Sequence, residues 1–133
     1  MAAQLLVRAP VDDIALSALH ARAFAIAAID PEPWSERLDR HSLLWVTAEE
    51  YGRLVGFVNV IGDGGKHAVL LDAVVDPTHQ GHGLGRQLVE AAAKAAREAG
   101  YEWLHVDFEN DLTDFYLRVC GFDHTAAGLR RLA

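Results

Sequence analysis

The spacing of apolar and polar residues changes several times along the chain, and each stretch predicts one element. Short apolar runs that end at turn residues predict strands, and apolar residues at every third or fourth position predict helices. In chain order, we expect a strand over 4–8, a helix from 13 to about Ile29, a short helix over 33–38, strands over 43–47, 54–61 and 68–75, a long helix ending at Gly100, a strand over 101–108 and a helix over 111–119. This order predicts a single α+β domain over residues 1–133, with a mixed, mostly antiparallel central sheet flanked by helices.

The strand over 68–75 and the long helix after it have the clearest patterns. The strand is apolar on both faces apart from Asp72, which is typical of a strand in the interior of a sheet. The long helix is amphipathic, so that one face should pack on the sheet. The residues expected on that face are Leu84, Leu88, Ala92, Ala95 and Ala99.

A glycine-rich turn from Gln80 to Arg86 joins this strand to the long helix. Gly83 and Gly85 lack side chains where the backbone enters the helix, so the first helical amides are unpaired at the positive end of the helix dipole. A turn of this kind can hold a phosphate group. It lacks the Lys-Ser/Thr ending of a P-loop, and its glycine spacing differs from that of dinucleotide-binding turns. The alternative is a tight turn that binds nothing.

Two stretches together resemble the GNAT-type N-acetyltransferases. The first is Gln80-x-x-Gly83-x-Gly85, preceded by a strand that ends in Val75-Asp76-Pro77. The second is Asp114-Phe115-Tyr116-Leu117-Arg118-Val119-Cys120-Gly121-Phe122, which is similar to a late Phe-Tyr motif of that family. The order of elements is also similar, from about residue 4 to residue 125. The resemblance implies an acyl-CoA N-acyltransferase fold, acetyl-CoA as cosubstrate, and direct transfer of acetyl to a primary amine in a ternary complex.

The resemblance also implies which residues bind acetyl-CoA. Backbone groups of Val74 and Val75 would pair with the pantetheine arm where two parallel strands separate. Family members often carry Asn six residues before the Phe of the second motif, but here that residue is Glu109, and the neighbouring Asn110 is the candidate pantetheine contact. The pyrophosphate would be held by amides of the turn, with the Arg86 side chain as a charged contact. The turn residues are Gln80, Gly81, His82, Gly83, Leu84, Gly85 and Arg86.

Acetyl transfer requires a deprotonated amine, a donor for the oxyanion and a hydrogen bond to the departing thiolate. An amide of Val74 or Val75 is the expected oxyanion donor. Tyr116, assigned from the second motif, is the expected acid; because a phenol is a weaker acid than a thiol, it would act by hydrogen bonding unless its pKa is lowered. The proton acceptor is open between Asp72, whose burial would raise its carboxyl pKa, and Glu109, near the expected separation of the strands.

Other interpretations of the same residues stay open. Tyr116 and Asp72 could be core groups with satisfied hydrogen bonds. No metal site is expected, because neither the histidines of the turn nor Cys120 with His124 provide three or four convergent ligands. We expect Cys120 to be a small buried hydrophobe rather than a covalent carrier of acetyl.

The composition of the chain argues against some classes of binding partner. The chain has 12 Lys and Arg against 19 Asp and Glu, a net charge of −7, which argues against general binding to nucleic acid and suits a cationic acceptor. Its single cysteine requires no oxidising compartment, and no apolar run approaches the ~20 residues of a membrane helix. We therefore expect a cytoplasmic protein with neither a nucleic-acid nor a membrane partner.

The sequence is compatible with more than one acceptor. We expect a small-molecule amine, with a peptide N-terminus or a lysine side chain as the alternative. A non-catalytic regulatory module that binds acyl-CoA would keep the same turn. A homodimer is expected from the resemblance alone. Four aromatic residues could line an acceptor cleft, although aromatic residues at such spacings are usually core: Phe24, Trp34, Trp45 and Phe57.

Overall fold

A computed structural model describes residues 2–27 and 30–133 and contains one mixed sheet. Its strands are β1 (Gln4–Val7), β2 (Leu44–Glu50), β3 (Arg53–Gly62), β4 (His67–Val75) and β5 (Trp103–His105), in that order across the sheet. Strands β1 to β4 pair antiparallel, whereas β4 and β5 pair parallel. The helices are α1 (Asp13–Ala23), α2 (Trp34–His41) and α3 (Leu84–Glu98), with the short segments η1 (Pro77–His79), η2 (Asn110–Leu112) and η3 (Asp114–Val119). The predicted α+β class is confirmed.

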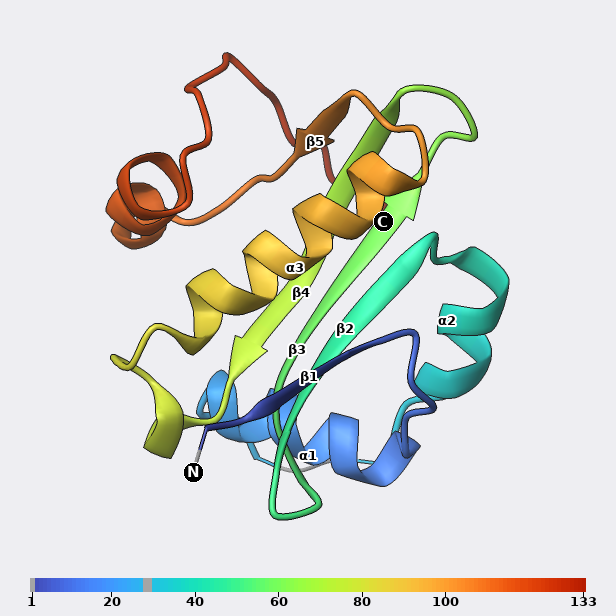
Figure 1. Cartoon of the computed structure of the whole chain (residues 1–133), viewed down its shortest axis with the longest axis vertical. Helices are drawn as coiled ribbons and strands as arrows, with labels where there is room; N and C mark the ends of the chain where they lie inside the picture. The colour runs from blue at the N-terminus through green and yellow to red at the C-terminus, as the bar shows by residue number, and fades with distance from the viewer. Residues whose placement is uncertain (1, 28–29) are drawn as a thin grey trace.

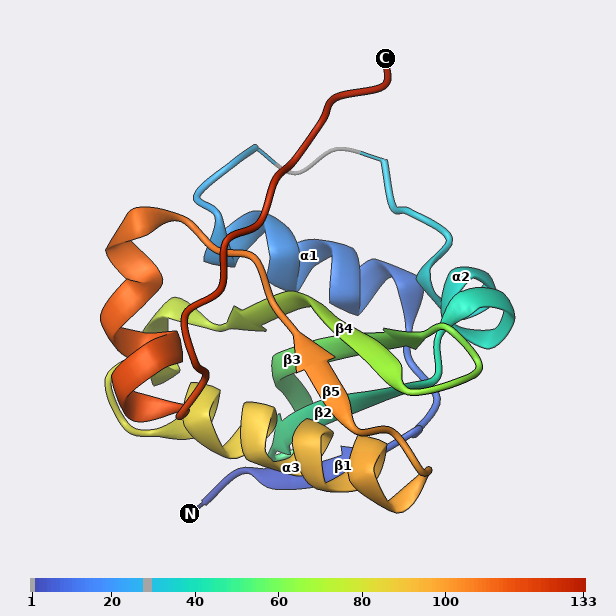
Figure 2. The ribbon, with the colours of Figure 1, turned by 90° about the horizontal axis from the view of Figure 1, so that it is seen from above.

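The sheet has a helical layer on each face (Figures 1 and 2). Helix α3 covers one face and buries Leu84, Leu88 and Ala92 against the sheet. Helices α1 and α2 cover the other face, where Leu16 and Leu38 are fully buried. The core therefore consists of two apolar clusters separated by the sheet, and β4 lies between them as its sequence predicted.

The buried face of α3 differs from the predicted one near its C-terminal end. Val89 and Ala96 are buried, whereas Ala95 is half-buried and Ala99 is exposed. The predicted row stepped three residues from Ala92 to Ala95, whereas the buried row keeps steps of four, from Ala92 to Ala96. Each step of four turns about 40° further around a helix of 3.6 residues per turn, so the buried stripe winds around α3 toward its C-terminal end.

Helix α1 is shorter than predicted. Asp12 caps its N-terminus as expected, since its Oδ1 accepts from the Ile14 amide at 3.0 Å. The helix ends at Ala23 rather than near Ile29, because Ala25 adopts a left-handed conformation with φ of +52° that interrupts the helical backbone. Ile29 itself lies outside the described residues.

The C-terminal elements also differ from their predictions. Strand β5 covers Trp103–His105 instead of 101–108, because the chain then turns away and Phe108 stacks on Tyr116 with ring centroids 4.9 Å apart. The helix predicted over 111–119 is divided into η2 and a π-helical turn, η3, in which the Cys120 amide donates to the Phe115 carbonyl at 2.9 Å. Such turns are rare and frequently lie at functional sites.

Candidate active site

Strands β4 and β5 pair at their beginnings and then separate. The pairs are His67 with Trp103, Ala68 with Leu104 and Val69 with His105. Beyond Val69, within the part of the chain that the structure describes, β4 has no strand partner on its β5 side. Its backbone groups on that side are therefore available to an extended ligand, as at other open strand edges. Val74 and Val75, the predicted pantetheine contacts, lie at the end of this open edge.

A β-bulge interrupts β4 within the open stretch. Phe57 pairs with Val74, but Asn59 pairs with Leu71, so β4 carries one more residue than β3 between these pairs. Asp72 lies in the bulge with φ of +56°, a conformation that non-glycine residues rarely adopt. The bulge changes the direction of the side chains and backbone groups where the two strands separate.

The open edge leads into the glycine-rich turn. Gly81 and Gly83 have φ of +80° and +84°, and Gly83 is the N-cap of α3 without any side-chain cap. A β-carbon at either glycine would meet no heavy atom within 4 Å, so space remains in front of the helix. The first amides of α3 point into that space without helical partners. Unpaired amides and open space fit the pyrophosphate of acetyl-CoA.

The other turn residues differ in which groups they can present to a ligand. The Gln80 side-chain amide donates to the Val75 carbonyl at 3.1 Å, so Gln80 fastens the turn to the end of β4. Leu84 packs its side chain into the core, which leaves only its amide for a ligand. His82 and Arg86 are exposed, and Arg86 lies in the first turn of α3.

Asp76 anchors the turn, a role that our sequence analysis did not assign to it. Its side chain is 2% exposed, and its Oδ1 accepts from the amide and hydroxyl of Thr78 at 3.0 and 2.8 Å. Its Oδ2 accepts from Arg22 Nε at 2.9 Å. Burial alone would raise the pKa of this carboxyl, but the bonds from Thr78 and Arg22 outweigh burial and lower it. The sequence feature that could have indicated this role of Asp76 is the Asp-Pro pair directly after an apolar strand.

Tyr116 lies in η3, with its side chain 6% exposed in the cluster beneath α3. The sequence left open a lowered pKa for this phenol. The structure contradicts that alternative, because burial, with smaller effects from Cys120 and Asp107, raises the pKa above its usual value. Tyr116 therefore remains protonated and suits a hydrogen-bond donor. Burial also raises the pKa of the Cys120 thiol, in line with a packed hydrophobe rather than a nucleophile.

Asp72 is not the buried acid that was predicted. Its side chain is 36% exposed and faces α1, where His20 Nε2 lies 3.9 Å from Asp72 Oδ1. The pKa of its carboxyl is lowered, mainly by the nearby His20 ring and with help from Asn59, against an opposing effect of burial. The expectation of a raised pKa is therefore wrong, because the groups around Asp72 are donors rather than hydrocarbon. A carboxylate held ionised in this way is a weak base and a good partner for a cation.

Glu109 and Asn110 lie on the exposed turn after β5, and Asn110 begins η2. Asp72 faces α1 on one side of the sheet, whereas Tyr116 packs beneath α3 on the other. The open edge of β4 therefore has these two predicted groups on opposite sides.

The sequence analysis did not identify His20 as a neighbour of Asp72, because a histidine within an apolar helical pattern carries no signal of what it faces. Of the four aromatic residues, Phe24 is exposed and the other three are in the core.

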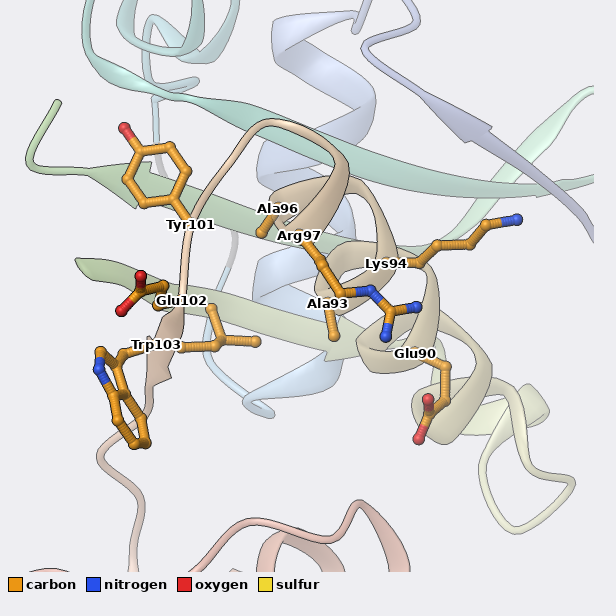
Figure 3. A pocket seen from close by; sticks show the side chains of 9 residues that line it. Glu90, Ala93, Lys94, Ala96, Arg97, Tyr101, Glu102 and Trp103 are labelled. Carbon is orange, nitrogen blue, oxygen red and sulfur yellow. The ribbon is translucent and has the colours of Figure 1, made fainter. Parts of the chain in front are cut away.

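A separate hollow of about 290 Å³ lies along the outer side of β5 (Figure 3). It is lined by the later turns of α3 and by residues 101–104, with Trp103 and Glu102 on one side and Arg97 on the other. This hollow does not include the glycine-rich turn or the open edge of β4.

Among residues 2–27 and 30–133, no group of three or more His, Cys, Asp and Glu side chains is arranged to hold a metal ion. In the same part of the chain, no helix has the length and apolar character needed to cross a membrane.

Comparison with known proteins identifies the family. The model of the acetyltransferase (GNAT) family matches residues 14–122. The chain therefore belongs to the GNAT acetyltransferase family, as its two motifs indicated.

Two curated relatives are plant proteins. One from Oryza sativa subsp. japonica, named serotonin N-acetyltransferase 2, chloroplastic, is 34% identical over 110 residues, covering 77% of this chain and 54% of the relative. One from Arabidopsis thaliana, named GCN5-related N-acetyltransferase 1, chloroplastic, is 34% identical over 89 residues, covering 67% of this chain and 45% of the relative. The chain thus spans about half the length of the curated relatives it matches.

The fold is also found in solved structures. An aminoglycoside acetyltransferase from an uncultured soil metagenomic sample, in complex with sisomicin, aligns with a TM-score of 0.80 and 17% identity. The alignment covers 98% of this chain and 96% of the other. At this identity the likeness establishes a shared fold.

Proposed function

We propose that this chain is an N-acetyltransferase that moves acetyl from acetyl-CoA to a primary amine by direct attack in a ternary complex. The observation that carries the proposal is the continuity between the open edge of β4 beyond Val69 and the open glycine turn at the N-terminus of α3. An extended pantetheine arm can add to the strand edge, and a diphosphate can accept from the free helix amides.

The residues proposed to hold acetyl-CoA are those predicted from the sequence. Val74 and Val75 contribute backbone groups to pantetheine, and residues 80–86 contribute amides to the pyrophosphate. Arg86 is exposed beside those amides, which suits a charge-assisted contact to phosphate. Asn110 remains a proposed pantetheine contact from the β5 side of the opening.

The reaction replaces the C–S bond of the thioester with a C–N bond. The ammonium loses one proton before attack, and the nitrogen loses a second when the amide forms; one of these two protons ends on the sulfur of the released CoA and the other goes to solvent. We propose that an amide of Val74 or Val75 donates to the oxyanion and that Tyr116 donates to the departing sulfur. Glu109, exposed to solvent, is the proposed final proton acceptor, directly or through water.

A small-molecule amine is the proposed acceptor, and a peptide amine is the alternative. The rice relative is named for serotonin, and the soil acetyltransferase structure contains sisomicin. Both of these compounds are amines. A cytoplasmic location and a homodimer remain predictions, and the two plant relatives are named as chloroplastic.

The test has two stages. Thermal unfolding with acetyl-CoA at about 100 times its dissociation constant should show a gain of about 2.7 kcal/mol in stability. Gly83→Glu, which places a carboxylate where the diphosphate would lie, should abolish that gain. Release of CoA thiol is then measured against a panel of primary amines. Binding without turnover on any amine would favour the non-catalytic module, and no binding would remove the proposal.

A further inference from the structure

Strand β5 is attached to the sheet by few bonds. It lies at the edge of the sheet and pairs with β4 over three residues (Figure 1). Among the described residues, no strand pairs with its outer side. The amides of Glu102 and Trp103 add two bonds, since both donate to the Lys66 carbonyl at 3.0 Å. A short edge strand of this kind opens locally at a small cost in free energy, so a further side-chain contact to β4 changes how often it opens.

Two histidines make such a contact between β4 and β5. Ala68 and Leu104 pair across the strands and pack in the core cluster beneath α3, so their neighbours along each strand point to the opposite face. His67 of β4 and His105 of β5 lie on that face, and both are exposed. His67 Nδ1 is 2.8 Å from His105 Nε2, and the ring centroids are 5.0 Å apart. The two rings therefore meet end to end along a hydrogen bond.

This contact has room for one hydrogen between the rings. In the neutral pair, one facing nitrogen donates and the other accepts, while the accepting ring carries its own hydrogen on its outward nitrogen. A first added proton binds the outward nitrogen of the donor ring, which makes the hydrogen bond charge-assisted and stronger. A second added proton has only the accepting nitrogen left to bind. Two N–H groups would then face each other across 2.8 Å, so the rings must separate.

The charges around the pair suit one added proton rather than two. Asp63, in the turn before β4, has a lowered pKa because it accepts from the Gly65 amide, with smaller contributions from the amide and the charge of His67 and against a small effect of burial. Its carboxylate therefore stays ionised near the pair. The other charged side chains of the adjoining segments and of the facing turns of α3, three positive and three negative, are Lys66, Glu90, Lys94, Arg97, Glu102 and Asp107.

We propose that His67 and His105 act as a proton-operated clamp: the shared hydrogen holds β5 against β4, and protonation of both rings releases β5. Histidine ordinarily titrates near pH 6.5, so release belongs to a mildly acidic medium below that value. Strand β5 leads directly into residues 106–116, where Phe108 stacks on Tyr116. Release of β5 would loosen this segment, which follows the point where the two strands separate. The clamp itself is independent of the proposed acetyl transfer, and only its effect on acetyl-CoA rests on that function.

The direction of the pH effect follows from the number of protons that each state binds. When β5 is open, both histidines can take up a second ring proton. While the clamp is closed, the pair takes up only one. The open state thus binds more protons than the closed state, and its population rises as pH falls.

Hydrogen exchange of the backbone amides tests the clamp without coenzyme. Protection factors for residues 103–105, which correct for the intrinsic pH dependence of exchange, are compared at pH 7.5 and at pH 5.0, where carboxylates stay mostly ionised. His105→Gln is the informative variant, because its side-chain amide takes the place of Nε2 and can donate or accept at either pH. His105→Ala removes the contact. His124→Gln, at an exposed histidine of the C-terminal segment, is the matched control.

In the wild type, protection should fall about three- to tenfold from pH 7.5 to pH 5.0, as expected for the loss of one hydrogen bond. His105→Gln should keep high protection at both pH values, His105→Ala should show low protection at both, and His124→Gln should match the wild type. The proposal would be overturned by wild-type protection that does not change with pH, or by a glutamine variant that loses protection in acid as the wild type does. An alanine variant as well protected as the wild type at pH 7.5 would also overturn it.

The affinity for acetyl-CoA is measured separately on the same variants. It should weaken in acid for the wild type and stay constant for His105→Gln, because only the wild type releases β5. Coenzyme that binds at neither pH would count against the proposed function and leave the exchange result intact. Coenzyme that binds the wild type equally well at both pH values, while the exchange result holds, would show that β5 opens without affecting the acetyl-CoA site.

Discussion

Gly85 lies directly against the ring of Phe115: a β-carbon built on Gly85 would be 3.2 Å from the Phe115 Cζ. This contact joins the beginning of α3 to η3, and so connects the glycine-rich turn to the segment that carries Tyr116. The Phe115 and Tyr116 rings meet edge to face, with centroids 4.9 Å apart. The two sequence motifs are thus parts of one packed unit.

Gly85→Val should disturb this unit. The added side chain must displace Phe115, and such overpacking typically costs about 1–3 kcal/mol of unfolding free energy. Because Phe115 contacts Tyr116, the variant should also lower the rate of acetyl transfer. Chemical denaturation and steady-state kinetics measure the two effects. A variant with wild-type stability and rate would show that Phe115 moves away freely.

Substitution of Gly83 should have a different effect, because glycine is needed there for its left-handed backbone conformation rather than for lack of space. At φ of +84°, alanine should cost about 1–2 kcal/mol, although no neighbouring atom opposes its β-carbon. Gly83→Asn should recover most of that stability, since asparagine tolerates left-handed backbone. Both side chains would project toward the proposed phosphate site, so both variants should bind acetyl-CoA more weakly. A Gly83→Asn variant with wild-type affinity would argue against phosphate binding at this turn.

Tyr116→Phe should lower turnover while leaving the affinity for acetyl-CoA unchanged. Loss of a donor to the leaving group typically lowers the rate by about tenfold to a thousandfold. Tyr51→Phe, at an exposed turn, is the matched control. Wild-type turnover in Tyr116→Phe, with Tyr51→Phe also normal, would remove the assigned role of Tyr116.

The raised pKa of Tyr116 also predicts a loss of stability in alkali. Burial raises its pKa above the ordinary 10.0, so the unfolded chain ionises first. The contribution of Tyr116 to folding is therefore complete below about pH 10 and decreases as pH rises through the folded value. Denaturation measured across this range should show a steeper decrease for the wild type than for Tyr116→Phe. Equal slopes would contradict burial of the phenol.

Asp76→Asn should be among the most damaging polar substitutions. It removes a buried charge that holds Arg22 and Thr78, and a loss of about 2–3 kcal/mol is expected. Glu36→Gln, which breaks an exposed i, i+4 pair with Arg40, should change stability by no more than about 0.5 kcal/mol. The lowered pKa of Asp76 means that its contribution is present above the ordinary carboxyl value and is lost as pH falls below about 4, so the wild type and Asp76→Asn should converge there. A difference between them that stays constant as pH falls well below that value would contradict the assigned charge.

The sequence predicted the strands best where their pattern was continuous. Residues 68–75 were apolar on both faces and became β4, which lies between two helical layers. The end of β5 could not be predicted, because it depends on Phe108 leaving the sheet to stack on Tyr116, a contact formed only in the folded chain. The end of α1 depends in the same way on the backbone conformation of Ala25.

The parts of the candidate site that depend on backbone geometry could be predicted from the sequence. The properties that depend on which side chains lie next to each other could not. Glycines followed by an amphipathic helix predicted free amides and open space, and the structure has both. The pKa of Asp72 was predicted in the wrong direction, because sequence alone could not place His20 and Asn59 beside it. These two residues come from α1 and β3, which are distant from Asp72 along the chain.

The most direct test of the central claim follows the backbone amides of an isotopically labelled chain by nuclear magnetic resonance as acetyl-CoA is added. The amides of residues 70–75 and 80–86 should change most, because the strand edge and the helix start would bond to the coenzyme. Their signals should saturate together, with smaller changes around Tyr116. Saturating acetyl-CoA that leaves both segments unchanged, or that shifts only residues around the hollow beside Trp103, would contradict the account.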